Sequence, residues 1–575
     1  MLLTKKVERP RELKWYQAGS MLYGDWGTSK AYVLGIAFAL SGHASWFFLG
    51  LMSALTALIG VCYMVICRLY PNGGGVYASV KQRNKTLAVV GALLVIADYV
   101  ITASLSALDS FHYFNVPHPE IWAIGAILTI GAINWFGPGR GGSIAAFIAV
   151  SASVVAGILF LTTLPSLPHV QLSLPHGPWF QNWSVFVGIV LALSGVEAIA
   201  DMTGIMKEPV ERTAKKAIWP VLLEVSILTF LLGIAMNAIP GLEGHTEDML
   251  RAIGTHYIGE WYGSVISIVF GFLLLSAVNT AITDLVSIQF LMAKDREIPF
   301  IFSKLNRYGM PWLALLVATL VPVLILIFEH EVVGLASLYA IGVVGAITLN
   351  LGSSGTNFKL DMTVRERVLL LIGASILFFV EITIAIQKHH ALIFALSVLT
   401  VGLTLRFLAK KVVPAPVPTM VPTTVEVLTV SEAKEIAPLY RSSSMVAIRS
   451  MNDALFEEAS LRTKALGENA IYLTYVEEVP VAYELPEEVE PSPESLELLA
   501  LAQIEFEKKG ITAVPVWQIG NDAGKLIARA ASELQAKVVM IGTTRRSALV
   551  SLLRGDVLRT LAHNLPRAAR LVIVG

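Results

Sequence analysis

Long apolar runs recur along most of this chain and restrict what it can fold into. Runs of about 20 residues follow one another from position 29 to position 409. A helix of about 20 residues crosses the roughly 30 Å hydrocarbon core of a bilayer. Only 15% of the 575 residues are charged and 55% are hydrophobic, a smaller charged share than soluble domains carry. The first 410 residues therefore predict an all-α membrane protein that crosses the bilayer many times.

We predict twelve transmembrane helices in this part of the chain. Their expected bounds are 17–41, 44–67, 87–112, 119–137, 142–163, 183–205, 217–239, 258–290, 311–328, 332–354, 366–387 and 390–409. Basic residues gather at the N-terminus, in 68–85 and at 410–411, whereas the opposite loops hold little beyond Arg251 and Lys388. Because Lys and Arg favour the cytoplasmic side, we expect a cell-membrane protein with both termini in the cytoplasm, and the even number of crossings agrees.

The composition changes after the last apolar run and divides the chain into three parts. Residues 1–410 form the expected transmembrane domain, and the Pro-rich stretch within 411–443 is typical of a linker. From 444 to 575, short apolar runs of strand character alternate with helical stretches. Strands that alternate with helices indicate a parallel sheet. We therefore expect a cytoplasmic, doubly wound α/β domain at the C-terminus.

Two of the predicted spans contain helix-weakening glycines beside a carboxylate. Asp25 lies between Gly24 and Gly27 in the first span, and Gly195 comes two residues before Glu197 in the sixth. Each glycine costs about 1 kcal/mol in a helix interior, so both helices should break and expose backbone carbonyls to a cavity. Since the two breaks are five spans apart, they suggest two five-span halves of inverted topology (a 5+5 repeat) with a site at their interface.

Other polar residues of the spans add oxygen ligands to these breaks. Asp98, Thr102 and Ser106 recur every four residues in the third span, so they share one helix face. Further polar candidates, in spans three, six, eight and ten, are Tyr99, Ser194, Asp201, Ser276, Asn279, Thr280, Asp284 and Tyr339. Buried ionisable groups are costly and are commonly functional, and oxygen ligands suit hard cations. These residues therefore indicate a secondary transporter for a small cation.

Nothing in the sequence predicts an enzyme. We find no Ser-His-Asp, Walker or metal-binding motif, and the eleven histidines lie mostly in loops without ligand spacing. The two cysteines, Cys62 and Cys67, share one apolar run and imply neither a disulfide framework nor a metal cluster. We expect the lipid bilayer as a partner and no nucleic acid.

The membrane part resembles the APC superfamily, which has the LeuT-type fold. The resemblance lies in the first two spans, in "PNGGGVYASVK" at 71–81, in "SGVEAI" at 194–199 and in "NTA" at 279–281. More narrowly, "YGDWGTSKAY" at 23–32 is similar to the first-span signature of the KUP potassium-uptake family. The run "DYVITASLS" at 98–106 is similar to that of its KimA-type branch, whose members are proton–potassium symporters. The resemblance covers roughly residues 15–410 and implies potassium import by proton symport.

The resemblance also implies roles for individual residues. The potassium-binding positions would be Asp25, Tyr32, Asp98, Tyr99, Thr102, Ser106, Ser194 and Tyr339, with Glu197 coupling transport to protons. Ser194 departs from a threonine of the KimA-like pattern but keeps the hydroxyl, and Lys30 stands where related patterns have an uncharged residue. Lys30 is about 140° from Asp25 around a helix, so it faces another helix, snorkels outward, or acts in coupling or gating. A Lys30 that reaches the site would argue against potassium.

The C-terminal domain resembles the universal stress proteins, which often bind adenine nucleotides. In the stretch "GTTRRSALVSLLRGD", Gly542 and Gly555 match the family's phosphate loop, whereas Arg545 replaces its middle glycine and Asp556 its Ser/Thr. The resemblance implies a regulatory nucleotide, either cyclic di-AMP or ATP/AMP, at this loop. We expect a homodimer formed through this domain. A structural dimerisation domain without any ligand is the alternative to nucleotide regulation, and we expect no other cofactor.

Three readings of the membrane part remain open from the residues alone. The first is the potassium importer, and the second is a proton-coupled amino-acid or polyamine permease of the same fold. Asp25 would repel the carboxylate of an amino acid, but it would tolerate a polyamine. The third reading is a membrane sensor that signals through its tail, and the polar groups at the broken spans argue against it.

Overall fold

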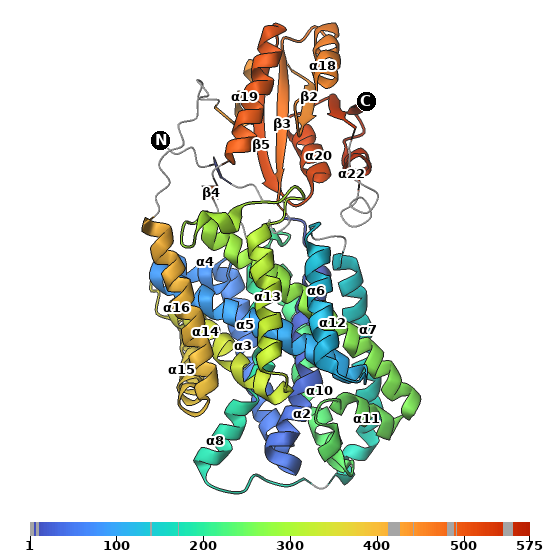
Figure 1. Cartoon of the computed structure of the whole chain (residues 1–575), viewed down its shortest axis with the longest axis vertical. Helices are drawn as coiled ribbons and strands as arrows, with labels where there is room; N and C mark the ends of the chain where they lie inside the picture. Colours follow the sequence, from blue (N-terminus) through green and yellow to red (C-terminus); the bar gives the residue numbers. More distant parts are fainter. Residues whose placement is uncertain are drawn as a thin grey trace.

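The computed structural model shows a helical body with an α/β domain at one end (Figure 1). It describes residues 5–6, 11–137, 141–170, 172–411, 426–440, 442–479, 488–489, 491–543 and 556–575. The C-terminus lies on the α/β domain, and the first described residues also lie on that side (Figure 1).

The helical body contains sixteen α-helices among the described residues. They are α1 (Trp15–Trp26), α2 (Ser29–Ser41), α3 (Ser45–Leu69), α4 (Val76–Lys81), α5 (Lys85–Tyr113), α6 (Pro119–Asn134), α7 (Gly141–Thr163), α8 (Trp179–Gly188), α9 (Ala198–Asp201), α10 (Val210–Ala235), α11 (Met249–Tyr257), α12 (Glu260–Lys294), α13 (Trp312–Phe328), α14 (Val332–Gly355), α15 (Val364–Gln387) and α16 (His389–Lys411). Short 3-10 helices join several of them: η1 (Gly42–Ala44), η2 (Leu164–His169), η3 (Val190–Leu193), η4 (Met202–Ile205), η5 (Met236–Ala238), η6 (Leu242–His245) and η7 (Phe300–Ser303).

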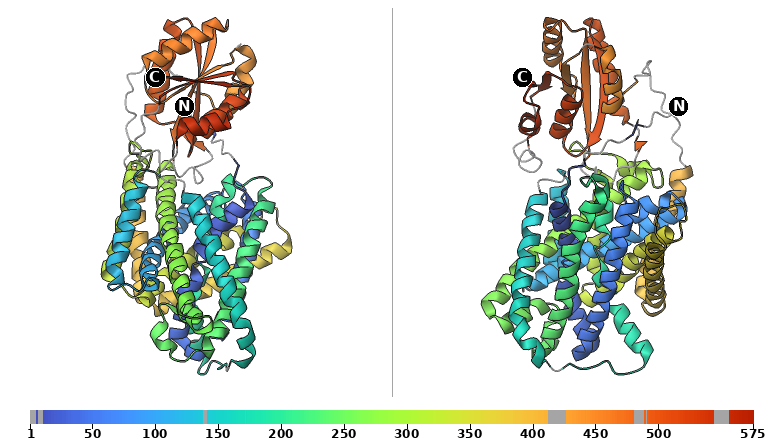
Figure 2. Two further views of the ribbon diagram at one scale, coloured as in Figure 1. Left: turned by 90° about the vertical axis from the view of Figure 1, so that its right-hand side faces the viewer. Right: turned by 180° about the vertical axis from the view of Figure 1, so that it is seen from behind.

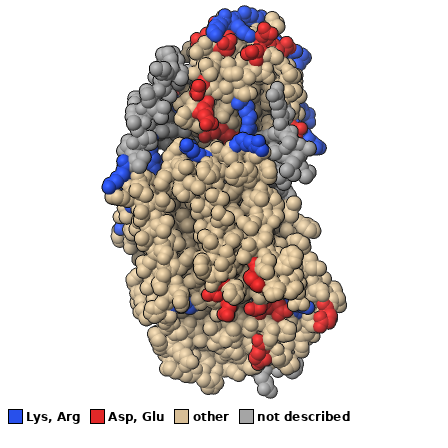
Figure 3. Space-filling model, in the orientation of Figure 1, with Lys and Arg blue, Asp and Glu red and all other residues tan. Residues whose placement is uncertain are grey.

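Many of these helices are long and apolar enough to cross a membrane. Within the described ranges there are eight such segments, or nine when α8 and the bent segment 190–205 are counted as one span. The shorter helices α6 and α13 are also apolar. Apolar side chains such as Phe147, Phe328 and Phe379 point outward and are 73%, 83% and 62% exposed. Figure 3 shows a wide band of the helical body almost without charged side chains. The prediction of a multi-pass, mostly helical membrane protein is confirmed.

Both predicted helix interruptions are present. The first span ends α1 at Trp26 and resumes as α2 at Ser29. The sixth span bends by 44° after α8, passes through η3 and turns at Gly195, whose φ is +87°. Only glycine adopts this left-handed backbone without strain, so Gly195 permits the turn that separates η3 from α9.

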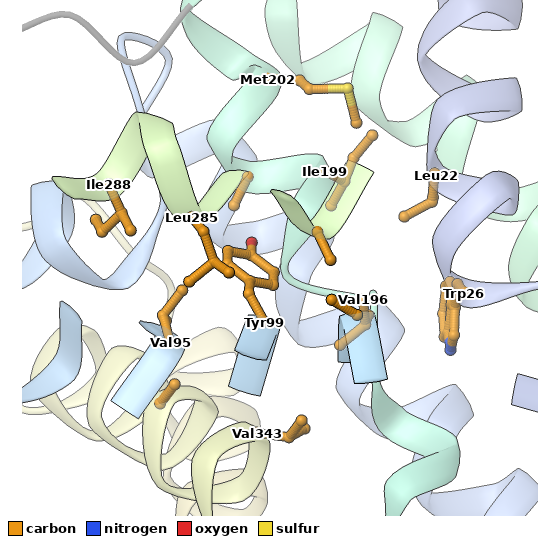
Figure 4. Packing of buried hydrophobic residues seen from close by; sticks show 14 of the residues in the cluster. Leu22, Trp26, Val95, Tyr99, Val196, Ile199, Met202, Leu285, Ile288 and Val343 are labelled. Carbon is orange, nitrogen blue, oxygen red and sulfur yellow. The ribbon is translucent and has the colours of Figure 1, made fainter. Parts of the chain in front are cut away.

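The helix α5 lies at the centre of the body. It packs against α12 and α14 most extensively and also against α4, α6, α13 and α16. Figure 4 shows part of the buried apolar cluster near the sixth-span break, with Val196 and Ile199 on one side of Tyr99 and Val343 of α14 below it. This packing holds the interrupted helices against a rigid central helix.

The C-terminal domain is a doubly wound parallel sheet, as predicted. Its strands are β2 (Ser444–Ile448), β3 (Ala470–Glu478), β5 (Thr512–Gly520), β6 (Val538–Gly542) and β7 (Arg570–Val574). All neighbouring strands are parallel, in the order β5-β3-β2-β6-β7. The helices α18 (Asp453–Ala465) and α19 (Pro493–Lys508) contribute to one apolar cluster, and α20 (Ala523–Glu533) and α22 (Val557–Asn564) to another. Helices thus cover both faces of the sheet (Figure 2).

Part of the expected linker 411–443 folds with this domain. Residues 412–425 lie outside the described residues, but 426–440 contain α17 (Val430–Ile436) and η8 (Ala437–Leu439). Leu428 forms a bridge with Val516 of β5, and α17 joins the apolar cluster under α20. The ordered domain therefore includes residues before 444.

The N-terminal segment joins the two parts of the chain. Strand β1 (Lys5–Lys6) pairs antiparallel with β4 (Glu488–Val489). Lys5 forms an ion pair with Glu432 of α17 at 3.0 Å, and Glu12 forms one with Lys525 of α20 at 3.3 Å. A few residues later the same segment enters α1, so the α/β domain is attached directly to the first broken span.

Candidate functional site

The two helix breaks lie against each other. A Cβ atom added to Gly195 would be 2.7 Å from the backbone N of Trp26 and 3.0 Å from the carboxyl carbon of Asp25. Side-chain atoms are not tolerated at such distances, so the turn of the sixth span fits closely against the end of α1. The absence of a side chain at Gly195 thereby brings the neighbouring Glu197 close to Asp25.

Hydroxyl groups satisfy part of the backbone that the first break frees. The side chain of Thr28 donates to the carbonyl of Asp25, and that of Ser29 donates to the carbonyl of Trp26 at 2.8 Å. Each carbonyl has a second lone pair, so these oxygens can still accept another ligand. The two glycines of the first break, Gly24 and Gly27, differ in the space around them. A Cβ at Gly27 would be 2.5 Å from the carbonyl oxygen of Tyr23, whereas a Cβ at Gly24 would meet no atom within 4 Å.

Three carboxylates converge at this point. Asp25 lies in the last turn of α1, Asp98 lies in the middle of α5, and Glu197 precedes α9, and all three are buried. Asp25 interacts electrostatically with Glu197, and Asp98 interacts with both. Among the described residues, no basic side chain is an electrostatic partner of Asp25 or Glu197. The cluster therefore has strong negative potential without an internal counter-charge.

Hydroxyl groups from three helices surround the carboxylates. Thr102 donates to the Asp98 carboxylate at 3.3 Å and to its backbone carbonyl at 3.0 Å. Tyr32 of α2 and Tyr339 of α14 both interact electrostatically with Asp25 and Asp98. Close packing supports this arrangement, since a Cβ at Gly342 would be only 2.8 Å from the backbone N of Asp98. Tyr339, which lies three residues before this glycine, is thereby held beside the cluster.

Several polar atoms of the cluster have no protein partner. Both carboxylate oxygens of Glu197 and the hydroxyl of Tyr339 are buried and make no hydrogen bond within the described part of the chain. Asp98 is a close neighbour of Glu197, and the two carboxyl groups share a hydrogen bond only when one of them is protonated. Buried polar groups are normally satisfied, so these atoms mark a place for an exchangeable ligand.

Tyr99, Ser106 and Ser194 are the remaining predicted ion-binding residues. Tyr99 interacts with Asp201 on the sixth span, and its ring lies among apolar side chains (Figure 4). Ser106 and Ser194 are buried, and no side-chain hydrogen bond ties either one to the carboxylates in the described structure. Their proposed ion-binding roles stay predictions.

Polar residues of the eighth span divide between two surroundings. Asp284 interacts with Asp201, which also interacts with Glu197, so a second acidic pair lies next to the cluster. In contrast, Asn279 accepts a hydrogen bond from Asn134 of α6 at 2.9 Å. The hydroxyl of Thr280 donates within its own helix, to the carbonyl of Ser276 at 3.1 Å.

Lys30 does not face the acidic cluster. Its ammonium group is fully buried and lies 2.6 Å from both carboxylate oxygens of Glu224 in α10. It also contacts the Tyr23 hydroxyl at 3.1 Å, and Tyr23 donates to Glu224 at 2.9 Å. Sequence reasoning missed Glu224, although a lysine inside a span needs a carboxylate partner and Glu224 lies within the predicted seventh span.

The described residues contain no group of three His, Cys, Asp or Glu side chains placed to hold a metal ion. The carboxylates of the cluster therefore do not form a carboxylate cage by themselves. A cation bound between them would also use hydroxyl and backbone carbonyl oxygens, which the helix breaks supply.

The predicted nucleotide loop is described only in part. Gly542 ends β6, and the strand order reverses between β2 and β6, where doubly wound sheets bind ligands. A Cβ at Gly542 would be 3.2 Å from the Asn452 side chain, at the start of α18. Arg545 and Gly555 lie outside the described residues. Asp556 caps α22 by accepting from the N–H of Leu558 at 2.9 Å.

Comparisons with known proteins match both parts of the chain. A family model described as amino acid permease matches residues 13–410, and one described as universal stress protein family matches 445–568. The potassium transporter KimA of Bacillus subtilis strain 168 is 27% identical over 390 residues, which are 60% of this chain and 62% of KimA. The polyamine transporter RMV1 of Arabidopsis thaliana is 22% identical over 311 residues, which are 51% of this chain and 62% of that protein.

A shorter match is to the probable potassium transport system protein Kup of Anaeromyxobacter sp. strain Fw109-5. It is 28% identical over 229 residues, which are 33% of this chain and 34% of Kup. The chain thus spans less than two thirds of the length of each of these relatives.

Proposed function

Because this chain belongs to the amino acid permease family, we propose that it is a secondary transporter that imports potassium together with protons. One observation carries the proposal: the carboxylates of Asp25, Asp98 and Glu197 meet where two broken helices touch, and no basic side chain of the described residues neutralises Asp25 or Glu197. Removing three like charges from water is costly, and a cation bound among them offsets much of that cost.

The chemistry of the neighbouring groups favours an alkali cation. Carboxylates, the hydroxyls of Thr102 and Tyr339, and the carbonyls of the first break are hard oxygen ligands. Lys30 supports the same conclusion, because its ammonium group is engaged by Glu224 and does not compete for the cluster. The potassium transporters KimA and Kup are among the relatives of this chain.

Glu197 is the proposed proton-coupling residue. A buried carboxylate without a hydrogen-bond partner is stable when it is protonated or when a cation lies beside it. Both oxygens of Glu197 are in this situation, at the turn of the sixth span. In the proposed symport the proton neutralises Glu197 while the carboxylates of Asp25 and Asp98 hold the cation, so that both are carried in the same step.

The proposed transporter has twelve crossings in two inverted halves of five plus two further helices. The segment Trp15–Leu69 is 55 residues long and would be about 80 Å if straight, enough for two crossings. Counting it as two, together with the bent pair and the shorter helices α6 and α13, supports twelve. The distribution of Lys and Arg supports a cytoplasmic location for both termini.

A polyamine is the second candidate substrate. The same carboxylates would bind ammonium groups, and one relative is named a polyamine transporter. The close contact of Gly195 with Asp25 leaves little room for a long substrate between the breaks, which favours the small cation.

For the C-terminal domain we propose regulation by a nucleotide. The reversal of strand order between β2 and β6, beside Gly542, supports this proposal, because doubly wound sheets bind ligands at such a position. Cyclic di-AMP and ATP or AMP are the candidate ligands, and a homodimer scaffold without a ligand is the alternative.

Rubidium uptake into proteoliposomes tests the proposed function. An inward proton gradient should drive accumulation, and Asp25→Asn should weaken rubidium binding because it removes charge but keeps shape. Glu197→Gln should abolish the dependence on the proton gradient. Glu260→Gln, an exposed acid at the start of α12, is the matched control and should behave as the wild type.

Two results would contradict this proposal. Proton-driven uptake of putrescine without rubidium uptake would support the polyamine alternative. Normal rubidium accumulation with an unchanged pH dependence in Glu197→Gln would remove Glu197 from the coupling mechanism.

A further inference from the structure

A second set of ionisable groups lies further along α5. Asp109 follows Asp98 by eleven residues, which is about 20° around the helix and about 16 Å along its axis. Both carboxylates therefore lie along one face of α5. This direction leads away from the α/β domain, toward the end of the helical body where α11 lies (Figure 1).

Asp109 is buried and lacks a hydrogen-bond partner. Its exposed fraction is 0%, and both carboxylate oxygens are unpartnered within the described structure. One turn later, His112 pairs through Nδ1 with Glu247 at 2.8 Å, and its Nε2 has no partner among the described residues. The carboxylate and the imidazole interact electrostatically. A buried acid beside an unused imidazole nitrogen is an arrangement that can exchange protons.

The charged groups that face Asp109 come from several elements. His112 lies on its own helix, and Glu247 and Asp248 lie on the segment between η6 and α11. Within the described residues, α12 and α14, which pack most extensively against α5, add no charged group to the electrostatic partners of Asp109. Asp248 is itself held by His245 at 2.9 Å and by Arg251 at 3.7 Å.

This set of groups is open to the solvent at one point. The Glu247 side chain is 51% exposed, and the hydrogen bond from His112 holds the pKa of Glu247 below its ordinary value, against a smaller opposing effect of burial. Glu247 therefore remains ionised and attracts protons to the imidazole. Figure 3 shows acidic side chains gathered toward this end of the helical body, whereas most of the Lys and Arg side chains on this face lie on or near the α/β domain.

Tyr32 connects the two sets of groups. It interacts electrostatically with Asp25 and Asp98 on one side and with Asp109 on the other. Its helix is also in close contact with the acidic segment, since a Cβ at Gly35 would be 1.7 Å from the carbonyl oxygen of Thr246. The segment that holds Glu247 is thereby packed directly onto α2, one turn beyond Tyr32.

We propose that Glu247, His112 and Asp109 form a proton-exchange site that connects the solution at the α11 end of the body with the buried acidic cluster. The proposal rests on the proposed function. The ligand is a proton, delivered as hydronium to the exposed Glu247 carboxylate: the bond to water breaks and a bond to a Glu247 oxygen forms. Glu247 passes that proton to His112 Nδ1 as the imidazole releases the proton of its buried Nε2. The proton then passes to an oxygen of Asp109, which leaves the imidazole neutral. Tyr32, whose side chain interacts electrostatically with Asp109, Asp98 and Asp25, is the group that links Asp109 to the acidic cluster.

Infrared difference spectroscopy of the purified full-length protein tests the site without transport. Between about pH 5 and about pH 8, where imidazoles titrate, the spectrum should contain a carboxylic-acid band that disappears in Asp109→Asn and shifts in Glu247→Gln. The matched control is Glu243→Gln, an exposed acid of the same segment, and it should leave the band unchanged. An identical titrating spectrum in Asp109→Asn would overturn the proposal.

Transport measurements test the connection to the acidic cluster. In Asp109→Asn, proton-driven rubidium uptake should fall by about a hundredfold at alkaline external pH, the lower end of the range for loss of an acid–base group. Rubidium exchange at equal pH on both sides should be unchanged, and Asp109→Glu should restore uptake, which excludes a folding defect. Equal loss of uptake and exchange would overturn the relay. A wild-type protein that moves no rubidium would instead contradict the proposed function, while the infrared band still reports on the site.

Discussion

The buried pair of Lys30 and Glu224 gives the sharpest quantitative prediction. Lys30 is fully buried and Glu224 has 15% of its side chain exposed, with 2.6 Å between the charged atoms. Removal of one partner of a buried ion pair leaves an uncompensated charge and typically costs about 3–5 kcal/mol. The cost of one charge at the centre of a bilayer, about 3 kcal/mol on insertion scales, is of the same order.

The two single substitutions should differ in a defined order. Glu224→Gln leaves a fully buried ammonium group with the Tyr23 hydroxyl at 3.1 Å and the Tyr23 ring centre at 4.8 Å, so we expect destabilisation near 5 kcal/mol, the upper end of the range. Lys30→Met leaves a partly exposed carboxylate that still accepts from Tyr23, so about 3 kcal/mol is expected. The double variant Lys30→Met/Glu224→Leu removes both charges and should lie within about 2 kcal/mol of the wild type.

Denaturant unfolding in mixed micelles measures these free energies, and rubidium uptake by the same variants measures function. Because the pair joins α2 to α10 and does not face the acidic cluster, the double variant should keep uptake. A stable double variant that loses uptake as Asp25→Asn does would refute the structural role and assign Lys30 to transport. Single variants as stable as the wild type would show that the pair contributes nothing.

Three further predictions concern other parts of the chain. Gly195→Ala should lower rubidium affinity by roughly tenfold or more, since a left-handed residue with a side chain costs about 1–2 kcal/mol and its Cβ would be 2.7 Å from the backbone N of Trp26. The control is Gly24→Ala, because a Cβ at Gly24 would meet open space. Equal losses of affinity in the two variants, measured by isothermal titration, would contradict the argument. If the α/β domain binds a nucleotide, cyclic di-AMP, ATP or AMP should raise the unfolding temperature of the full-length protein. An unfolding temperature that none of the three nucleotides changes would support the alternative of a dimer scaffold without a ligand. Burial alone would raise the pKa of Glu432, but hydrogen bonds at the N-cap of α17 and the Lys5 ammonium hold this pKa below its ordinary value. Docking of the N-terminal segment should therefore be complete at neutral pH and be lost as the pH falls through the lowered pKa. Hydrogen exchange of residues 11–14 measures this docking, and Lys5→Glu should release the segment while the charge-swapped pair Lys5→Glu/Glu432→Lys restores it.

The sequence by itself determined the features that depend on local physics. Apolar runs long enough for a bilayer predicted the helices, and the glycines at 24, 27 and 195 predicted the two interruptions, because a missing side chain acts on its own backbone. Gly24 itself lies within α1, so the first interruption is at Gly27. The alternation of strands and helices predicted the doubly wound domain for a similar reason. The spacing along one helix also brought Asp98 and Thr102 together correctly, since both lie on α5.

The tertiary structure decided which of these residues meet. Lys30 and Glu224 are 194 positions apart, and nothing local in either helix shows that α2 and α10 face each other. The same holds for His112 with Glu247, and for Gly195 with Asp25. Tyr99 interacts with Asp201 because of how the sixth span packs on α5, and its predicted ion-binding role stays a prediction. Periodicity specifies the direction of a side chain around its own helix, but the neighbour in that direction is set by the packing of all the helices at once.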